Sequence, residues 1–139
     1  MLGLVTINRE SKENRSSVKD AIESALKKTS VQLFPTGTRV CNQTYANREI
    51  VVKRGSIDVA VKNGTPIVVI YHNIGEKIDD KNCLFHWEKR IYAISSDVLV
   101  MPVEHLNKTY EERCEIMYNM VYNEFIRLED GIKNVLYRL

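Results

Sequence analysis

The side chains best suited to chemistry lie in one stretch, residues 55–73. Asp58 comes early in an apolar run, and a second apolar run over residues 66–70 ends in Tyr71-His72-Asn73. A carboxylate near the start of the first of two such apolar runs can hold a divalent cation. The cation screens a phosphate group and lowers the pKa of a bound water. The stretch therefore points to metal-dependent hydrolysis of a phosphodiester, with Asp58 as a metal ligand.

Strands are expected to position these side chains. Residues 57–62 and 66–71 are rich in β-branched residues, and Asn63-Gly64 between them is a strong hairpin signal. Residues 50–53 predict a further strand, which makes a small antiparallel meander. On the last of these strands residues 71 and 73 share one face, because side chains alternate along a strand.

Helical patterns surround the meander. Apolar residues at helical spacing predict a helix that opens at Ser17 and closes near residue 28. They predict another after residue 81, with Leu84, Trp87, Ile91 and Ile94 on one face. Because strand patterns over 66–71 and 97–103 bracket the second helix, they favour parallel pairing. Residues 2–7 predict a short strand, and residues 31–40 an extended arm with a turn.

A long helix is predicted at the C-terminal end. Thr109 and Glu112 form a capping box, and apolar residues then recur at spacings of three and four up to residue 139. Asp130-Gly131 predicts an end or a kink within it. The apolar seam is long for a small sheet, so we expect a homodimer built on residues 109–139.

Composition limits the class of protein. The 139 residues predict one domain, 1–139, and a mild net charge of +2 gives no indication of a polyanionic partner. Three widely spaced cysteines fit a reducing compartment, and no apolar run reaches the roughly 20 residues that cross a bilayer. We therefore expect no membrane partner, and the cytoplasm or the interior of a virus-infected cell.

The order of elements, with Asp58 and the Val-Lys-Asn-Gly-Thr-Pro-Ile-Val-Val-Ile run, resembles the PD-(D/E)XK, or restriction-endonuclease-like, superfamily over residues 17 to about 105. The resemblance implies an α/β fold with a restriction-endonuclease-like core, a mixed β-sheet flanked by helices, followed here by the long C-terminal helix. It also implies that Asp58 is the first acid of the catalytic motif. Tyr71 then occupies the position of the second acid, and Asn73 that of the lysine.

This departure implies that the nuclease-like site has decayed, because neither tyrosine nor asparagine supplies an anionic ligand at neutral pH. The first function expected is therefore a nucleic-acid-binding protein without cleavage. Basic side chains near the strand pair would contact DNA or RNA: Arg48, Lys53, Arg54 and Lys81.

Two alternatives stay open. An active endonuclease could use Mg²⁺ or Mn²⁺ with displaced groups, namely Glu76 as a second metal ligand beside Asp58, and Glu23, Glu49 and Lys77 in catalysis. The other alternative is a non-enzymatic nucleotide- or protein-binding α/β dimer, although no glycine-rich phosphate loop is present.

Overall fold

The computed structural model describes residues 14–36, 44–73, 78–79, 84–85 and 91–136. The helices are α1 (Asn14–Leu26), α2 (Gly55–Asn63), the short 3₁₀ helix η2 (Val103–His105) and α3 (Tyr110–Leu136). The strands are β1 (Ile70–His72), β2 (Ile78–Asp79), β3 (Leu84–Phe85) and β4 (Ala93–Ser95). The predicted α/β class is thus confirmed as helices with short antiparallel strands and a long C-terminal helix.

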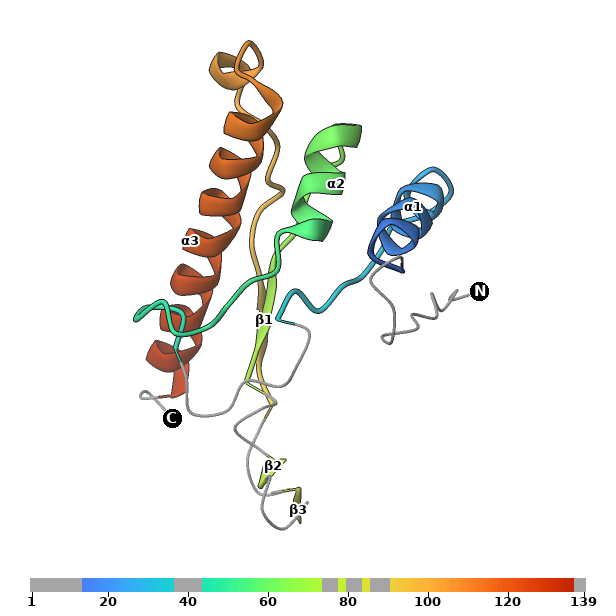
Figure 1. Cartoon of the computed structure of the whole chain (residues 1–139). Coiled ribbons are helices and arrows are strands. Elements are labelled where there is room, and N and C mark those ends of the chain that lie inside the picture. The colour runs from blue at the N-terminus through green and yellow to red at the C-terminus, as the bar shows by residue number, and fades with distance from the viewer. Residues whose placement is uncertain (1–13, 37–43, 74–77, 80–83, 86–90, 137–139) are drawn as a thin grey trace.

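Helix α3 lies along one side of the molecule (Figure 1). The paired strands β1 and β4 run along it, α2 packs on it beside them, and α1 lies on the far side of α2. The small β2–β3 pair lies beyond the end of the β1–β4 pair. The apolar core therefore lies between α3 on one side and α2 with β1 on the other.

The capping box at the start of α3 is confirmed. The Glu112 carboxylate accepts hydrogen bonds from the Thr109 backbone N–H and hydroxyl, each at 2.9 Å, and the Thr109 hydroxyl in turn accepts from the Glu112 N–H at 3.3 Å. These bonds from Thr109 lower the pKa of Glu112. The seam behind the cap is buried as predicted at Cys114, Met117, Val121, Phe125, Leu128 and Ile132, whereas Tyr110 and Val135, which belong to the same predicted seam, are exposed.

The expected end or kink at Asp130-Gly131 was wrong, because α3 continues through it to Leu136. Glycine costs about 1 kcal/mol in a helix interior. The turns around it bury Leu128 completely and Ile132 almost so, with 0% and 4% exposed. Burial of two large aliphatic side chains contributes more than that cost, so packing sustains the helix.

Residues 57–62, predicted as a strand, form helix α2 instead. The Asn63-Gly64 pair ends this helix: Gly64 adopts a left-handed conformation with φ of 61°, and the N–H groups of Gly64 and Thr65 donate to Val61 and Ala60. This is a helix C-cap, which uses the same left-handed glycine as a hairpin turn. Ile57 and Val61, one turn apart, join the core, and Val59 and Ala60 are buried as well, so the β-branched residues reflect burial on more than one face of a helix and not a strand.

The parallel crossover was also wrong. Strand β4 pairs antiparallel with β1, with Tyr71 opposite Ile94, and an isolated bridge joins Ile67 to Leu99. Leu84 lies in β3 and Ile94 in β4, so the predicted helix over this region is not formed at either place. Residues 50–53 form no strand and have a bend at Ile50, and residues 97–103 form a β-bridge only at Leu99; residues 2–7 lie outside the described part of the chain.

Residues 44–50, here named the Tyr45 loop, are held on α3 by a buried carboxylate. Glu129, with 2% exposed, accepts hydrogen bonds from the backbone N–H groups of Tyr45 at 3.0 Å and Ala46 at 3.4 Å, and lies 3.6 Å from Lys133. The Tyr45 ring stacks on Phe125 at 4.6 Å between centroids. Burial, with the Glu129 charge second, raises the pKa of Tyr45 to about 12.

The same loop carries backbone strain. Arg48 has φ of 56°, a left-handed conformation that costs a non-glycine residue about 1–2 kcal/mol. The Thr44 N–H donates to the Glu49 carboxylate at 3.2 Å, the Arg48 N–H to the Tyr45 carbonyl at 3.0 Å, and the Tyr122 hydroxyl to the Ile50 carbonyl at 3.1 Å. These bonds and the Glu129 carboxylate together hold the strained conformation.

Among the described residues, no helix has the length and apolar character needed to span a bilayer. The seam of α3 is buried against α2, β1 and the Tyr45 loop of the same chain. A homodimer through residues 109–139 stays a prediction.

The cap of α2 makes a stability prediction. Gly64→Ala should destabilise the protein by about 1–2 kcal/mol, because alanine is strained at positive φ. Gly55→Ala, at the first position of the same helix, should be neutral or stabilising, since its φ is not positive and the new methyl group would lie 3.7 Å from Lys19 Cε. Urea unfolding of both variants measures the difference, and equal losses would contradict the cap.

The Glu129 anchor makes a second prediction. Glu129→Ala should lower the free energy of unfolding by about 2–3 kcal/mol, because buried N–H groups lose their acceptor. Glu124→Ala on the same helix removes a carboxylate that pairs with exposed Arg127, and should cost much less. Urea unfolding monitored by tyrosine fluorescence tests both, and similar losses would show that Glu129 is no anchor.

Candidate functional site

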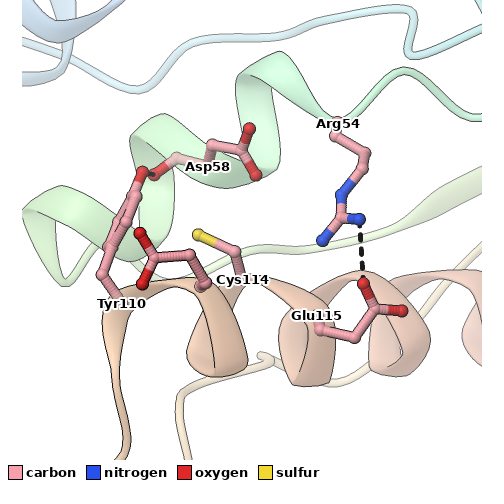
Figure 2. A pocket seen from close by; sticks show the side chains of 6 residues that line it. Arg54, Asp58, Tyr110, Cys114 and Glu115 are labelled. Atoms are coloured by element: carbon pink, nitrogen blue, oxygen red, sulfur yellow. Dashed lines mark hydrogen bonds and ion pairs between the residues drawn. The ribbon is translucent and has the colours of Figure 1, made fainter.

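A pocket of about 340 Å³ opens between α2 and the first turns of α3 (Figure 2). Asp58 reaches it from α2 and Cys114 from α3, with Arg54 and Glu115 at one end and Tyr110 at the other. Arg54 and Asp58 lie one turn apart, since the Asp58 N–H donates to the Arg54 carbonyl at 2.9 Å. The helical form of α2 is therefore what brings a guanidinium and a carboxylate to one pocket.

Two contacts fix the ends of this pocket. The Arg54 guanidinium lies 2.8 Å from a Glu115 carboxylate oxygen, and the Tyr110 hydroxyl donates to the Asp58 backbone carbonyl at 3.0 Å. Burial is the main cause that raises the pKa of Tyr110 to about 12. The phenol is therefore neutral at physiological pH and acts as a hydrogen-bond donor.

The Cys114 thiol lies at the inner side of the pocket, with 4% of the residue exposed. Burial raises the pKa of this thiol above its ordinary value, and the negative charge of Asp58 adds to the effect. Since the thiolate is the nucleophilic form, a raised pKa disfavours covalent catalysis by Cys114 at neutral pH.

Asp58 also lines a second pocket, on the α1 side of α2. There Lys19 lies 3.9 Å from the Asp58 carboxylate, and Lys62 donates to Glu23 at 2.9 Å. The bond from Lys62 is the main cause that lowers the pKa of Glu23. The structure thus brings together Asp58 and Glu23, two of the acids selected from the sequence.

The other selected residues of the described chain lie elsewhere. Tyr71 is half-buried on β1, with its ring 6.0 Å from that of Tyr45, and Asn73 is buried and accepts a hydrogen bond from the Tyr92 N–H at 2.8 Å. Glu49 holds the Tyr45 loop through the Thr44 N–H. None of the three is among the described residues that line the two pockets.

The basic residues divide between two places. Arg54 lies 5.1 Å over the Tyr118 ring and Arg48 lies 5.3 Å over the Tyr122 ring, whereas Lys53 is exposed and its backbone N–H donates to the Pro35 carbonyl. Glu76, Lys77 and Lys81 lie outside the described residues. Within the described ranges no three His, Cys, Asp or Glu side chains gather in a group that could hold a metal ion.

The sequence did not single out the α3 side of the pocket as functional. Tyr110 and Cys114 were both counted as members of the apolar seam, and Glu115 gave no signal. A helical interpretation of residues 55–63 would have found part of the site, because Arg54 and Asp58 are four residues apart.

The raised thiol pKa makes a prediction for Cys114. In a Cys41→Ser/Cys83→Ser background, iodoacetamide should alkylate Cys114 more slowly at pH 7.5 than the same chain in urea, because burial disfavours the thiolate and limits access. The rate should rise only at a pH above that of an ordinary thiol. Mass spectrometry of alkylation against pH measures it, and rapid labelling near neutral pH would instead identify a reactive thiol.

Comparison with known proteins identifies one family. The family model described as Acyltransferase matches residues 1–73, which include α1, the Tyr45 loop, α2 and β1. No curated protein and no solved structure matches the chain.

This match corrects the function expected from the sequence. The resemblance to the PD-(D/E)XK superfamily was wrong, and with it the nuclease and nucleic-acid-binding functions, because the matched family is a different one. The expectation of Mg²⁺ or Mn²⁺ rested on the nuclease function, and metal binding itself stays a prediction. Residues 1–73 are more than half of the 139 residues, so the chain belongs to the Acyltransferase family.

Proposed function

We propose that this protein takes part in acyl transfer from an activated donor, such as a coenzyme A thioester, to a hydroxyl or amine acceptor. The family match over residues 1–73 carries the proposal. The matched segment also supplies Arg54 and Asp58, the basic and acidic groups that enter the α2–α3 pocket from the α2 side.

The pocket favours direct transfer without an acyl-enzyme. A buried thiol with a raised pKa is a poor nucleophile, so Cys114 is not the acceptor of the acyl group. In direct transfer the acceptor oxygen or nitrogen attacks the thioester carbonyl carbon. The new bond forms, the carbon–sulfur bond breaks, and the acceptor's proton is passed on to the departing thiolate.

Among the described residues, the carboxylates that line the pocket are Asp58, Glu111 and Glu115; we assign the proton to Asp58, the one that the matched segment supplies. Its side chain is 24% exposed and lines both pockets. The Lys19 ammonium lies 3.9 Å from its carboxylate. Arg54 stands one turn away, where a guanidinium can stabilise negative charge that develops on the carbonyl oxygen. A positioned general base contributes typically about 10²–10⁴-fold to a rate.

The proposed function is tested by measuring product formation. The assay combines acyl-coenzyme A donors of several chain lengths with hydroxyl and amine acceptors. Asp58→Asn should lower kcat at least about 100-fold, because the amide cannot take up a proton. Asp130→Asn removes an exposed carboxylate from α3 and should leave the rate unchanged. Cys114→Ala should retain activity.

These outcomes test the proposed acyl transfer separately from the roles assigned to Asp58 and Cys114. Transfer that survives Asp58→Asn would remove Asp58 from the chemistry while leaving acyl transfer in place. Activity lost in Cys114→Ala, with the fold intact by circular dichroism, would replace direct transfer by an acyl-cysteine route. No transfer with any donor and acceptor would contradict the proposed function.

A further inference from the structure

The second pocket that Asp58 lines lies between α1 and α2 and has a volume of about 190 Å³. Asp58 and Tyr110 line both pockets, so a molecule held between α1 and α2 lies against the carboxylate assigned as proton acceptor. We propose that this α1–α2 pocket binds the acceptor of the acyl group, and that the acceptor is a small amino acid. The inference rests on the proposed function and names its acceptor.

The volume of the pocket limits the size of the ligand. Pockets that hold drug-sized molecules measure roughly 300–1,000 Å³. The α1–α2 pocket, at about 190 Å³, is smaller than these, whereas the α2–α3 pocket, at about 340 Å³, lies within the range. A large acyl donor therefore suits the α2–α3 side of Asp58, and a small acceptor suits the α1–α2 side.

Charges of both signs line the α1–α2 pocket in alternation. Lys19 and Glu23 lie one turn apart on α1. Asp58 and Lys62 lie one turn apart on α2. Across the pocket the Lys19 ammonium lies 3.9 Å from Asp58, and the Lys62 ammonium lies 2.9 Å from Glu23. Each helix thus presents one cation and one anion, in opposite order along the two helices.

This arrangement complements a molecule that carries one positive and one negative group. Side chains four residues apart on a helix are neighbours, with about 5–6 Å between their Cβ atoms. Along α2 an ammonium group can therefore donate to Asp58 while a carboxylate of the same molecule accepts hydrogen bonds from Lys62. A free amino acid carries both groups on one carbon, so it can make both contacts at once.

Solvent exposure leaves the two lysines able to change partner. The exposed side-chain fraction is 52% for Lys19 and 60% for Lys62, against 24% for Asp58 and 22% for Glu23. Ion pairs with a partner this exposed contribute little to stability. A ligand can therefore replace these pairs at small cost, while the carboxylates stay partly shielded from water.

An amine at Asp58 also fits the transfer chemistry. The bound ammonium group first loses one proton to solvent. Its nitrogen then attacks the thioester carbonyl carbon, so that the carbon–nitrogen bond forms and the carbon–sulfur bond breaks. The second proton leaves the nitrogen through Asp58 and passes to the departing thiolate. The products are an N-acyl amino acid and a thiol.

NMR titration of the ¹⁵N-labelled full chain with three probes tests the pocket. L-Alanine carries both charged groups, ethylamine lacks the carboxylate, and propionate lacks the ammonium group. L-Alanine should bind at least about 10-fold more tightly than either of the others, because each charged group adds its own hydrogen bond.

Lys62→Met is the decisive variant. It should weaken L-alanine binding at least about 10-fold and leave ethylamine binding within about twofold, since only L-alanine has a carboxylate for Lys62 to contact. A structural effect on the pocket would weaken both. Lys53→Met removes an equal charge from an exposed residue that lines neither pocket, and should leave both affinities unchanged.

No binding of L-alanine, or equal losses for L-alanine and ethylamine in Lys62→Met, would overturn the acceptor site. The outcome is separable from that of the acyl-transfer assay. L-Alanine binding that depends on Lys62 in a chain without transferase activity would keep the site and refute the proposed function. Acyl transfer to hydroxyl acceptors by a chain that does not bind L-alanine would keep the function and refute the site.

Discussion

A single buried carboxylate joins the two parts of the chain. Glu129 accepts backbone N–H groups of Tyr45 and Ala46, 84 and 83 residues away in sequence. A buried charge is tolerated only where hydrogen bonds and a counter-charge replace water, and here the two N–H groups and Lys133 do so. Because the carboxylate is fixed on α3, the Tyr45 loop is fixed as well. The aromatic contacts to Phe125 and Tyr122 and the conformation of Arg48 depend on that placement.

Helix α3 serves both the core and the surface. Its buried seam closes the core, whereas Tyr110 and Glu115 reach the pocket and Tyr118 and Tyr122 support two guanidinium groups. The family match ends at residue 73, before this helix begins. Residues beyond the matched segment thus form one wall of the candidate site and orient the arginines that the matched segment supplies.

Two groups of the pocket are uncharged. The Cys114 thiol is buried, which raises its pKa, and the exposed Tyr110 phenol, whose pKa is raised to about 12, donates a hydrogen bond to the Asp58 carbonyl. The charged groups of the pocket keep exposed surface: Asp58 and Arg54 on the α2 side, and Glu111 and Glu115 on α3. This division is what makes direct transfer chemically more reasonable at this pocket than transfer through a covalent cysteine intermediate.

Local signals in the sequence determined both long helices. The spacing of apolar residues and the Thr109 capping box predicted α1 and α3, because helix periodicity and capping depend on residues only a few positions apart. The bounds of α1 differ from the prediction, since the helix begins at Asn14 and not at Ser17, and ends at Leu26. The β-branched run over 57–62 and Asn63-Gly64 were ambiguous, since a buried helix with a glycine cap and a strand with a hairpin turn use the same residues. Only the tertiary structure decided between them, by packing Ile57 and Val61 against the core. It also decided the site: the meeting of Glu129 with Tyr45, and of Arg54 and Asp58 with Cys114, joins distant segments whose separation leaves no local pattern to detect.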